Sequence, residues 1–179
     1  KRSVTLDLSS DEGRSAARRL ALASDVVVEN FRPGLMERFG LDHGSLAAEH
    51  PGLVYCSLTA FGEGEGAARP GYDILVQALS GLMSFTGHPG GEPTKVGVAL
   101  LDVVCGLYAS NAIQAALIGR GRTGRGARVT VSLFDASVAA LRPGATLGNR
   151  SDPVPVSESS GQWSRSRGFS ASTAVRIGR

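Results

Sequence analysis

Short apolar runs that alternate with helical segments constrain the fold of this chain more than any other feature. Residues 25–28, 53–58 and 128–133 are apolar and too short for core helices, as is typical of strands in a parallel sheet. Residues 3–8 alternate in polarity and predict a further strand. A helix over residues 12–23 then joins two strands in one βαβ unit. The chain is therefore predicted to be α/β.

Further helices are predicted between and after the strands. The segment 9–12 (Ser-Ser-Asp-Glu) places capping side chains and acids at the start of the first helix. The other expected helices cover residues 35–39, 42–49, 72–83, 103–118 and 134–141. The helix at 103–118 is apolar almost all round, so we expect it to be buried in the domain or in a subunit interface.

Composition excludes several functional classes. The chain has 179 residues, a net charge of +3 and 42% hydrophobic residues, which is ordinary for a soluble globular domain. Its basic stretches have no interleaved aromatic residues, so nucleic-acid binding is not expected. No apolar run reaches 18 residues, so no membrane span is expected either. Cys56 and Cys105 lack metal-ligand spacing and predict reduced core thiols in a cytoplasmic protein without a metal site.

One carboxylate stands out at the start of the apolar helix. Asp102 is the only charged residue between Lys95 and Arg120. An unpaired carboxylate in apolar surroundings is costly to bury, by several kcal/mol. It is either an N-cap for a helix starting at Val103 or a nucleophile or base held at that helix N-terminus. The residues alone leave both alternatives open.

The loop after the second predicted strand is a candidate binding site. Residues 29–34 (Glu-Asn-Phe-Arg-Pro-Gly) lie at the carboxyl end of a strand, where open α/β sheets bind ligands. The loop is either a solvated turn or a phosphate or nucleotide site with Asn30 and Arg32 as donors. The glycine-rich loop 63–71 is no dinucleotide fingerprint.

Five segments in unbroken order resemble CoA-transferase family III, the CaiB/BaiF type. The family includes formyl-CoA:oxalate and carnitine CoA-transferases and the related α-methylacyl-CoA racemase. The matching segments are residues 29–40, 69–78, 81–87, 95–102 and 123–135. The resemblance covers about residues 1–141. It implies a Rossmann-like large domain with an open, mostly parallel sheet and flanking helices, in chains that interlock as homodimers.

The resemblance also implies roles for individual residues. Asp102 matches the catalytic aspartate, which attacks an acyl-CoA thioester. The substrates are then acyl-CoA and a carboxylic acid, without a permanent cofactor. The implied contacts to coenzyme A are Leu6, Asp7, Leu8, Ser9, Asn30, Phe31, Arg32, Arg38, Pro70, Gly71, Tyr72 and Asp73. Ser9 stands where the family often has lysine.

The last part of the sequence differs in character. Residues 151–179 are rich in Ser and Arg with little periodicity, which predicts a poorly ordered tail. We expect a partial large domain over residues 1–142 and an irregular tail over 143–179, as in a truncated chain. Two other functions stay open beside the transferase: an α-methylacyl-CoA racemase-like enzyme and an inactive fragment. His43, His50 and His88 show no match to the partner base that a racemase needs.

Overall fold

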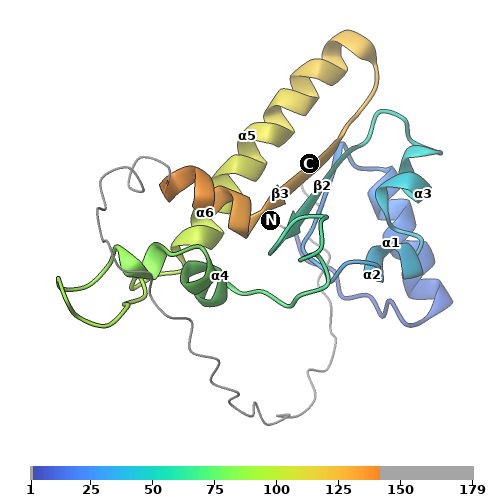
Figure 1. Cartoon of the computed structure of the whole chain (residues 1–179). Helices are drawn as coiled ribbons and strands as arrows, with labels where there is room; N and C mark the ends of the chain where they lie inside the picture. The colour runs from blue at the N-terminus through green and yellow to red at the C-terminus, as the bar shows by residue number, and fades with distance from the viewer. Residues whose placement is uncertain (1, 142–179) are drawn as a thin grey trace.

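A three-stranded parallel sheet forms the centre of the molecule (Figure 1). The computed structural model describes residues 2–141. The strands are β1 (Val26–Glu29), β2 (Val54–Thr59) and β3 (Arg128–Ser132), in the order β1-β2-β3. In the register, Val26 lies opposite Val54 and Tyr55 lies opposite Arg128. The predicted α/β class with an open parallel sheet is confirmed.

Three helices cover one face of the sheet. They are α1 (Asp11–Leu22), α2 (Leu35–Arg38) and α3 (His43–Ala47), which lie together on one side of the strands (Figure 1). Side chains alternate along a strand, so Val27 and Tyr55 face these helices from paired positions. They join a core with buried apolar residues from the helices and loops: Leu8, Ala17, Ala21, Met36, Leu41, Leu46 and Leu53.

The long helix α5 (Leu100–Thr123) packs on the opposite face, beside α4 (Asp73–Leu79) and α6 (Leu133–Leu141). Cys56 of β2 and Cys105 of α5 meet in this layer, and both are buried free thiols. Burial raises the pKa of each thiol to about 11, so both are protonated at neutral pH. The prediction of reduced core thiols is confirmed for these residues.

The predicted strand at residues 3–8 was wrong. Residues 2–7 form no regular element, and residues 8–9 form a turn. A strand needs a neighbour for its backbone hydrogen bonds, and this segment has no such neighbour within the described residues. Its apolar side chains are accommodated differently, because Leu8 is buried in the core and Leu6 packs against it.

Two helix boundaries also differ from the predictions. The segment predicted as one helix over residues 72–83 is α4 followed by a short 3₁₀ turn, Leu82–Ser84. Gly81 separates them with φ of 83°, a left-handed conformation that ends a helix. Helix α5 starts at Leu100 rather than Val103 and ends where Gly124 adopts φ of 70°.

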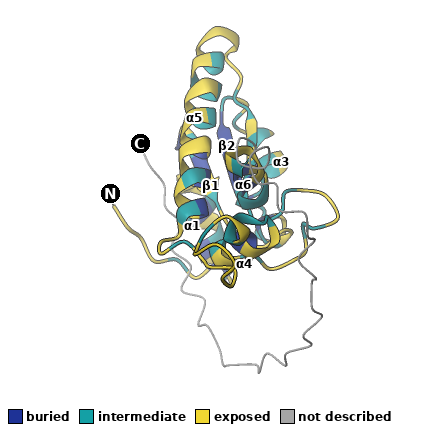
Figure 2. Ribbon diagram, turned by 60° about the vertical axis from the view of Figure 1, so that its left-hand side comes forward, coloured by how far each residue is buried: buried dark blue, intermediate teal, exposed yellow. Residues whose placement is uncertain are grey.

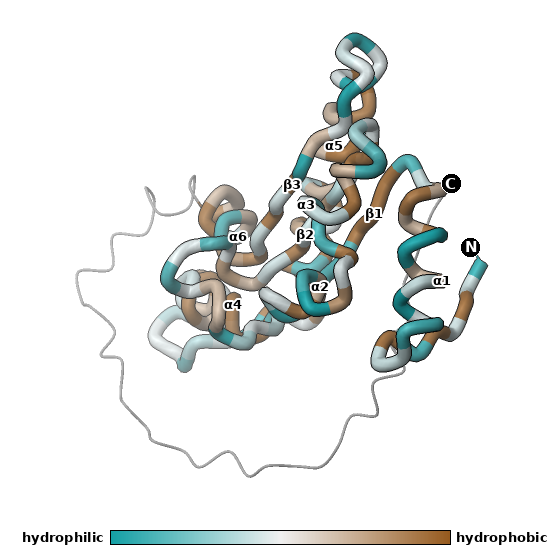
Figure 3. The backbone as a smooth tube through the Cα atoms, turned by 90° about the vertical axis from the view of Figure 1, so that its right-hand side faces the viewer, coloured by the Kyte–Doolittle hydropathy of each residue, from teal (hydrophilic) through white to brown (hydrophobic). Residues whose placement is uncertain are grey.

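Only one stripe of α5 is buried within the described chain. Leu101, Cys105 and Ala109 are buried at four-residue spacing, whereas Val103, Leu107 and Ile118 are exposed (Figure 2). The exposed large apolar residues of α5 are Val103, Leu107, Tyr108 and Ile118, and Figure 3 shows hydrophobic and hydrophilic residues along the helix. By length and composition alone, α5 is able to cross a membrane, although apolar core helices share these properties. Within residues 2–141, burial in the domain therefore holds for one stripe of α5 only, and burial in a subunit interface stays a prediction.

The tail predicted over residues 143–179 lies outside the described residues.

Candidate functional site

Asp102 lines a cavity of about 680 Å³ at the carboxyl ends of the strands. The walls come from the loop after β1, the end of β2, the start of α4 and the first turns of α5. Four of the residues expected to contact coenzyme A line this cavity together with Asp102: Asn30, Gly71, Tyr72 and Asp73. Asp102 thus lies at a cavity together with residues of two other predicted segments.

A second cavity of about 200 Å³ continues the first. The two share Asn30, Gly71 and Tyr72 and the end of β2, so they form one groove. Three more of the predicted coenzyme A residues, Phe31, Arg32 and Pro70, line this second part. The structure thus brings two sequence segments, 30–32 and 70–73, together beside Asp102.

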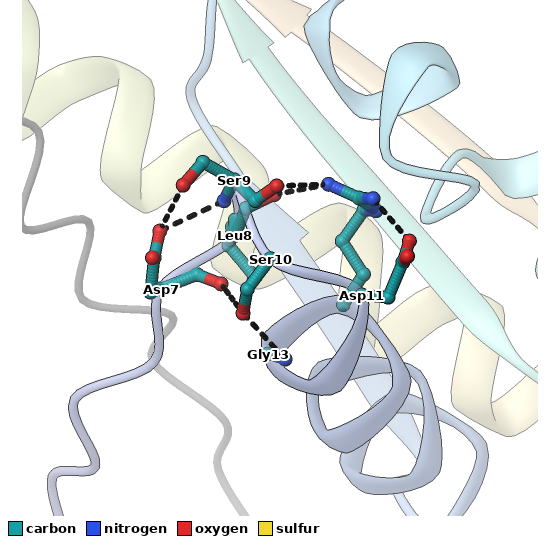
Figure 4. Close-up of polar contacts among 7 residues, drawn as sticks. Asp7, Leu8, Ser9, Ser10, Asp11 and Gly13 are labelled. Carbon is teal, nitrogen blue, oxygen red and sulfur yellow. Dashed lines mark hydrogen bonds and ion pairs between the residues drawn. The ribbon is translucent and has the colours of Figure 1, made fainter.

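Arg38 and the segment 6–9 lie outside this groove. Arg38 is an exposed residue at the end of α2 and lines neither cavity. Residues 7–10 form a tight turn before α1 (Figure 4). One carboxylate oxygen of Asp7 accepts hydrogen bonds from the backbone N–H and the hydroxyl of Ser9, at 2.9 and 2.6 Å. These bonds lower the pKa of Asp7. Contacts of this segment with coenzyme A stay a prediction.

The alternative of Asp102 as an N-cap was wrong. The N-cap position of α5 is Ala99, which has no capping side chain, and Asp102 lies inside the first turn. The cap comes from α4 instead. One carboxylate oxygen of Asp73 accepts hydrogen bonds from the backbone N–H groups of Leu101 and Asp102, at 2.7 and 3.1 Å. The side chain of Asp102 is therefore free for another role.

Gln77 completes the connection between α4 and α5, and sequence reasoning did not identify its role. The side chain is almost fully buried, with 1% exposed. Its amide nitrogen donates to the other carboxylate oxygen of Asp73, and its carbonyl oxygen accepts from the Val96 N–H at 2.9 Å. Gln77 thereby fixes both Asp73 and the loop that leads into α5. Its four-residue spacing from Asp73 on one helix face was the available signal.

The pKa of Asp102 is raised from its ordinary value. Desolvation by burial is the larger cause, and the negative charge of Asp73 is the second. A position at a helix N-terminus would by itself favour the ionised form. Here the partial burial and the neighbouring carboxylate outweigh that effect. A carboxylate with higher proton affinity is also the more reactive nucleophile once it is ionised.

The amides of the first turn of α5 already have partners. The Leu100 N–H donates to the Val98 carbonyl, and the Val103 N–H donates to the Ala99 carbonyl at 3.3 Å. With Leu101 and Asp102 bonded to Asp73, these four groups are all engaged. An attack on a thioester, which the family resemblance implies, needs hydrogen-bond donors for the oxyanion. In this arrangement those donors must come from another segment.

We predict that Asp73→Ala destabilises the fold by about 2 kcal/mol. The substitution removes a charged cap from two backbone N–H groups and leaves buried Gln77 without one partner. Urea unfolding followed by circular dichroism measures the change. Asp73→Asn should show a smaller loss, because its oxygen keeps the cap while its amide nitrogen meets the Gln77 amide nitrogen as a second donor. A loss below about 0.5 kcal/mol for the alanine variant would contradict the assigned role.

We predict that Asp102→Asn makes the folded state slightly more stable at neutral pH. The folded-state pKa lies above the ordinary value of 3.8, so ionised Asp102 costs stability above that folded pKa. This cost disappears below pH 3.8, where Asp102 is protonated in both the folded and the unfolded state. Because Asp102 is largely exposed, solvent screening limits the gain to less than about 1 kcal/mol. Urea unfolding should show the gain at pH 7 and its loss at pH 3. A gain that is independent of pH contradicts the assignment.

Comparisons with known proteins agree on one family. The chain matches the profile of CoA-transferase family III over residues 1–173. It is 44% identical over 161 residues to a succinate–glutarate CoA-transferase of Agrobacterium fabrum, covering 83% of this chain and 40% of that protein. It is 42% identical over 144 residues to an acetyl-CoA:oxalate CoA-transferase of Acetobacter aceti. This match covers 79% of this chain and 37% of that protein.

Solved structures give the same result for the fold. The crystal structure of a CaiB/BaiF family protein from Brucella suis superposes with a TM-score of 0.79 and 47% sequence identity. The match covers 82% of this chain and 39% of that protein. The chain therefore spans about 40% of the length of the relatives it matches.

Proposed function

The chain belongs to CoA-transferase family III, and from that membership we propose that it transfers coenzyme A between carboxylic acids, with Asp102 as the nucleophile. The observation that carries this proposal is the shared groove. Asp102 lines one cavity with Asn30 and Tyr72, and the groove continues to Phe31 and Arg32. A reactive carboxylate thus lies at one end of a channel whose other end carries a phosphate-binding guanidinium.

The proposed chemistry begins with attack on a thioester. The carboxylate of Asp102 attacks the carbonyl carbon of acyl-CoA, forms a mixed anhydride and releases the CoA thiolate. The thiolate then attacks the aspartyl carbon, forms an aspartyl-CoA thioester and releases the first acid as a carboxylate. The acceptor carboxylate attacks this thioester and again expels the thiolate. Return of the thiolate to the acceptor's acyl carbon gives the new acyl-CoA and regenerates Asp102.

The cavity suits a weak nucleophile of this kind. A carboxylate must be partly desolvated and held in line to attack a thioester. Burial already raises the pKa of Asp102, and the Asp73 cap fixes the turn that carries it. The groove lined by residues 30–32 and 70–73 is the proposed path of coenzyme A, with Arg32 toward its phosphates. Arg38 and residues 6–9 are further proposed contacts that rest on the family resemblance alone.

Lys95 supports a carboxylic acid as the acceptor. Among the residues that line the Asp102 cavity, Lys95 alone carries a positive charge, and two carboxylates line the same walls. An incoming carboxylate would otherwise meet only the negative charges of Asp73 and Asp102. The related proteins carry names that refer to succinate, glutarate and oxalate. We propose dicarboxylic acids of this size as substrates.

The racemase alternative is not favoured. A racemase needs a base beside the α-carbon, and none of the residues lining the Asp102 cavity is a histidine. The similar proteins described above are named as CoA-transferases.

The function is tested by a transfer assay run in deuterium oxide. The full chain is incubated with succinyl-CoA and glutarate, and in parallel with a 2-methylacyl-CoA. The proposal predicts glutaryl-CoA by liquid chromatography with mass spectrometry, and no deuterium in the 2-methylacyl-CoA. Deuterium incorporation without transfer would identify a racemase. Neither product, from a folded sample that binds coenzyme A, would identify an inactive fragment.

A second copy of the chain is the partner that we propose for α5. The exposed apolar residues Val103, Leu107 and Ile118 lie on the helix that also carries Asp102. Apolar surface of this kind is typical of subunit contacts. Sedimentation velocity should show a dimer, and Leu107→Glu should shift the population toward monomer. A wild-type chain that stays monomeric at all concentrations contradicts this proposal.

A further inference from the structure

A third cavity, of about 460 Å³, lies on the sheet face opposite α5. Its floor is the face of β2 that carries Tyr55, Ser57 and Thr59, and its walls come from α2, the start of α3 and the loop after β2. It shares Phe31, Arg32, Pro33, Thr59 and Ala67 with the coenzyme A groove but does not include Asp102 or Asn30. The proposed transfer reaction uses Arg32 at this boundary but none of the carboxylates of the cavity.

Two side chains that are nearly buried, those of Tyr55 and Ser57, line this cavity with a hydroxyl group each. Tyr55 is 2% exposed and Ser57 is 7% exposed. Neither hydroxyl takes part in a hydrogen bond within residues 2–141, and no fully sealed side-chain polar atom there lacks a partner. Both hydroxyls therefore open onto the cavity that they line. Because neither hydroxyl is engaged by a protein group among the described residues, both are free to bond to a molecule in the cavity.

The charge of the cavity favours a cation. Four carboxylates line it, those of Glu29, Glu37, Asp42 and Glu63, against the guanidinium groups of Arg32 and Arg128. Glu63 already pairs with Arg128 at 2.5 Å. Apart from that ion pair, the charged groups of the cavity are the carboxylates of Glu29, Glu37 and Asp42 and the guanidinium of Arg32. Burial raises the pKa of Tyr55, and the carboxylates of Glu29, Asp42 and Glu37, which line the same cavity, raise it further.

The free hydrogen-bonding capacity can be assigned atom by atom. Glu29 uses one carboxylate oxygen to accept from the Phe31 N–H at 2.8 Å, which leaves its other oxygen available. Glu37 forms no side-chain hydrogen bond or ion pair among the described residues. Asp42 is held in place because it caps α3 through Ser45 at 3.0 Å. The cavity therefore presents fixed acceptors and two hydroxyls to its contents.

The spacing of these acceptors excludes a bare metal ion. Within residues 2–141 no group of three His, Cys, Asp or Glu side chains is close enough to hold a metal. A cavity of this volume holds a small organic molecule. Carboxylates at separate positions in the cavity can each accept a hydrogen bond from a different donor group of one such molecule. Primary ammonium and guanidinium groups supply charged donors of this kind.

We propose that this cavity is a binding site for a small organic cation that carries primary ammonium or guanidinium groups, held by Glu29 and Glu37 and by the hydroxyls of Tyr55 and Ser57. The site is separate from the proposed transfer reaction and stands or falls independently of it. The whole chain carries a net charge of +3, so general electrostatic attraction does not draw a polycation to it.

Calorimetric titration of the full chain with spermidine tests the proposal. We expect saturable binding that weakens as the salt concentration rises. Tyr55→Phe removes only the hydroxyl, and Glu37→Gln removes an exposed charge that does not contribute to the core. Each should raise the dissociation constant at least about fivefold, because hydrogen bonds to charged groups are among the stronger ones. Glu12→Gln on α1 is the matched control and should leave the constant unchanged.

Three outcomes overturn the proposal. The first is the absence of saturable heat up to about 10 mM spermidine, a concentration that covers very weak binding. The second is equal weakening by Glu12→Gln and Glu37→Gln, which indicates diffuse attraction. The third is tighter binding of glutarate than of spermidine, which would mean that Arg32 and Arg128 define an anion site. If Tyr55→Phe fails to fold, Glu37→Gln alone decides the result.

Discussion

A chain with alanine in place of Gly126 is expected to lose about 3 kcal/mol or more of folding free energy. A Cβ atom at this position would lie 1.9 Å from the Leu53 carbonyl oxygen and 2.3 Å from its carbon. Both are backbone atoms at the start of β2, so no flexible side chain can move aside. Gly126 also donates its N–H to the Pro51 carbonyl at 2.9 Å. Relief of the clash must therefore separate β2 from the segment leading into β3.

Urea unfolding followed by circular dichroism measures this loss. Gly121→Ala is a matched control, because Gly121 lies in α5 and a Cβ there meets nothing within 4 Å. Alanine is favoured over glycine inside a helix, so the control should be stabilised by about 0.5 to 1 kcal/mol. Equal stability of the Gly126 variant and the wild type would contradict the close packing of the β2 and β3 starts.

Asp102→Asn is expected to lower the rate of CoA transfer at least about a thousandfold. The amide is not nucleophilic, so neither the anhydride nor the aspartyl thioester forms. The variant should still fold, because the Asp102 side chain caps nothing and accepts no hydrogen bond in the first turn of α5. The assay is formation of glutaryl-CoA from succinyl-CoA and glutarate.

Two controls separate chemistry from binding in this experiment. Coenzyme A should bind the Asn variant as it binds the wild type, since the groove residues are unchanged. Asp102→Glu keeps the carboxylate but moves it by one methylene, which should cost about a hundredfold in rate because attack depends on alignment. An Asn variant with more than a tenth of the wild-type rate would exclude Asp102 as the nucleophile.

The strands and most helices were predictable because their signals are local. The apolar run at residues 26–28 forms β1, in which Val27 is buried and Val28 is exposed, and the Ser10 cap marks the start of α1. The segment 3–8 has the same kind of local signal but forms no strand. Strand formation depends on a neighbouring strand, which the segment's own residues do not determine.

The sequence identified candidate residues of the site, but not the hydrogen bonds that join segments distant in the sequence. The sequence identified Asp102 and the loops at residues 30–32 and 70–73. The cap that Asp73 supplies to α5 joins residues that are 28 and 29 positions apart, so no local pattern reveals it. The same holds for the cavity at Tyr55 and Ser57, whose walls come from three separate segments. Contacts of this kind arise only after the chain has folded.

Direct detection of the aspartyl intermediate tests the central claim most sharply. The full chain is mixed with succinyl-CoA without acceptor, quenched in acid and analysed by intact-protein and peptide mass spectrometry. The account predicts a covalent adduct with the mass of coenzyme A less one water, located on Asp102 and absent from Asp102→Asn. A chain that turns over succinyl-CoA to glutaryl-CoA without this adduct, or with an adduct on another residue, would contradict it.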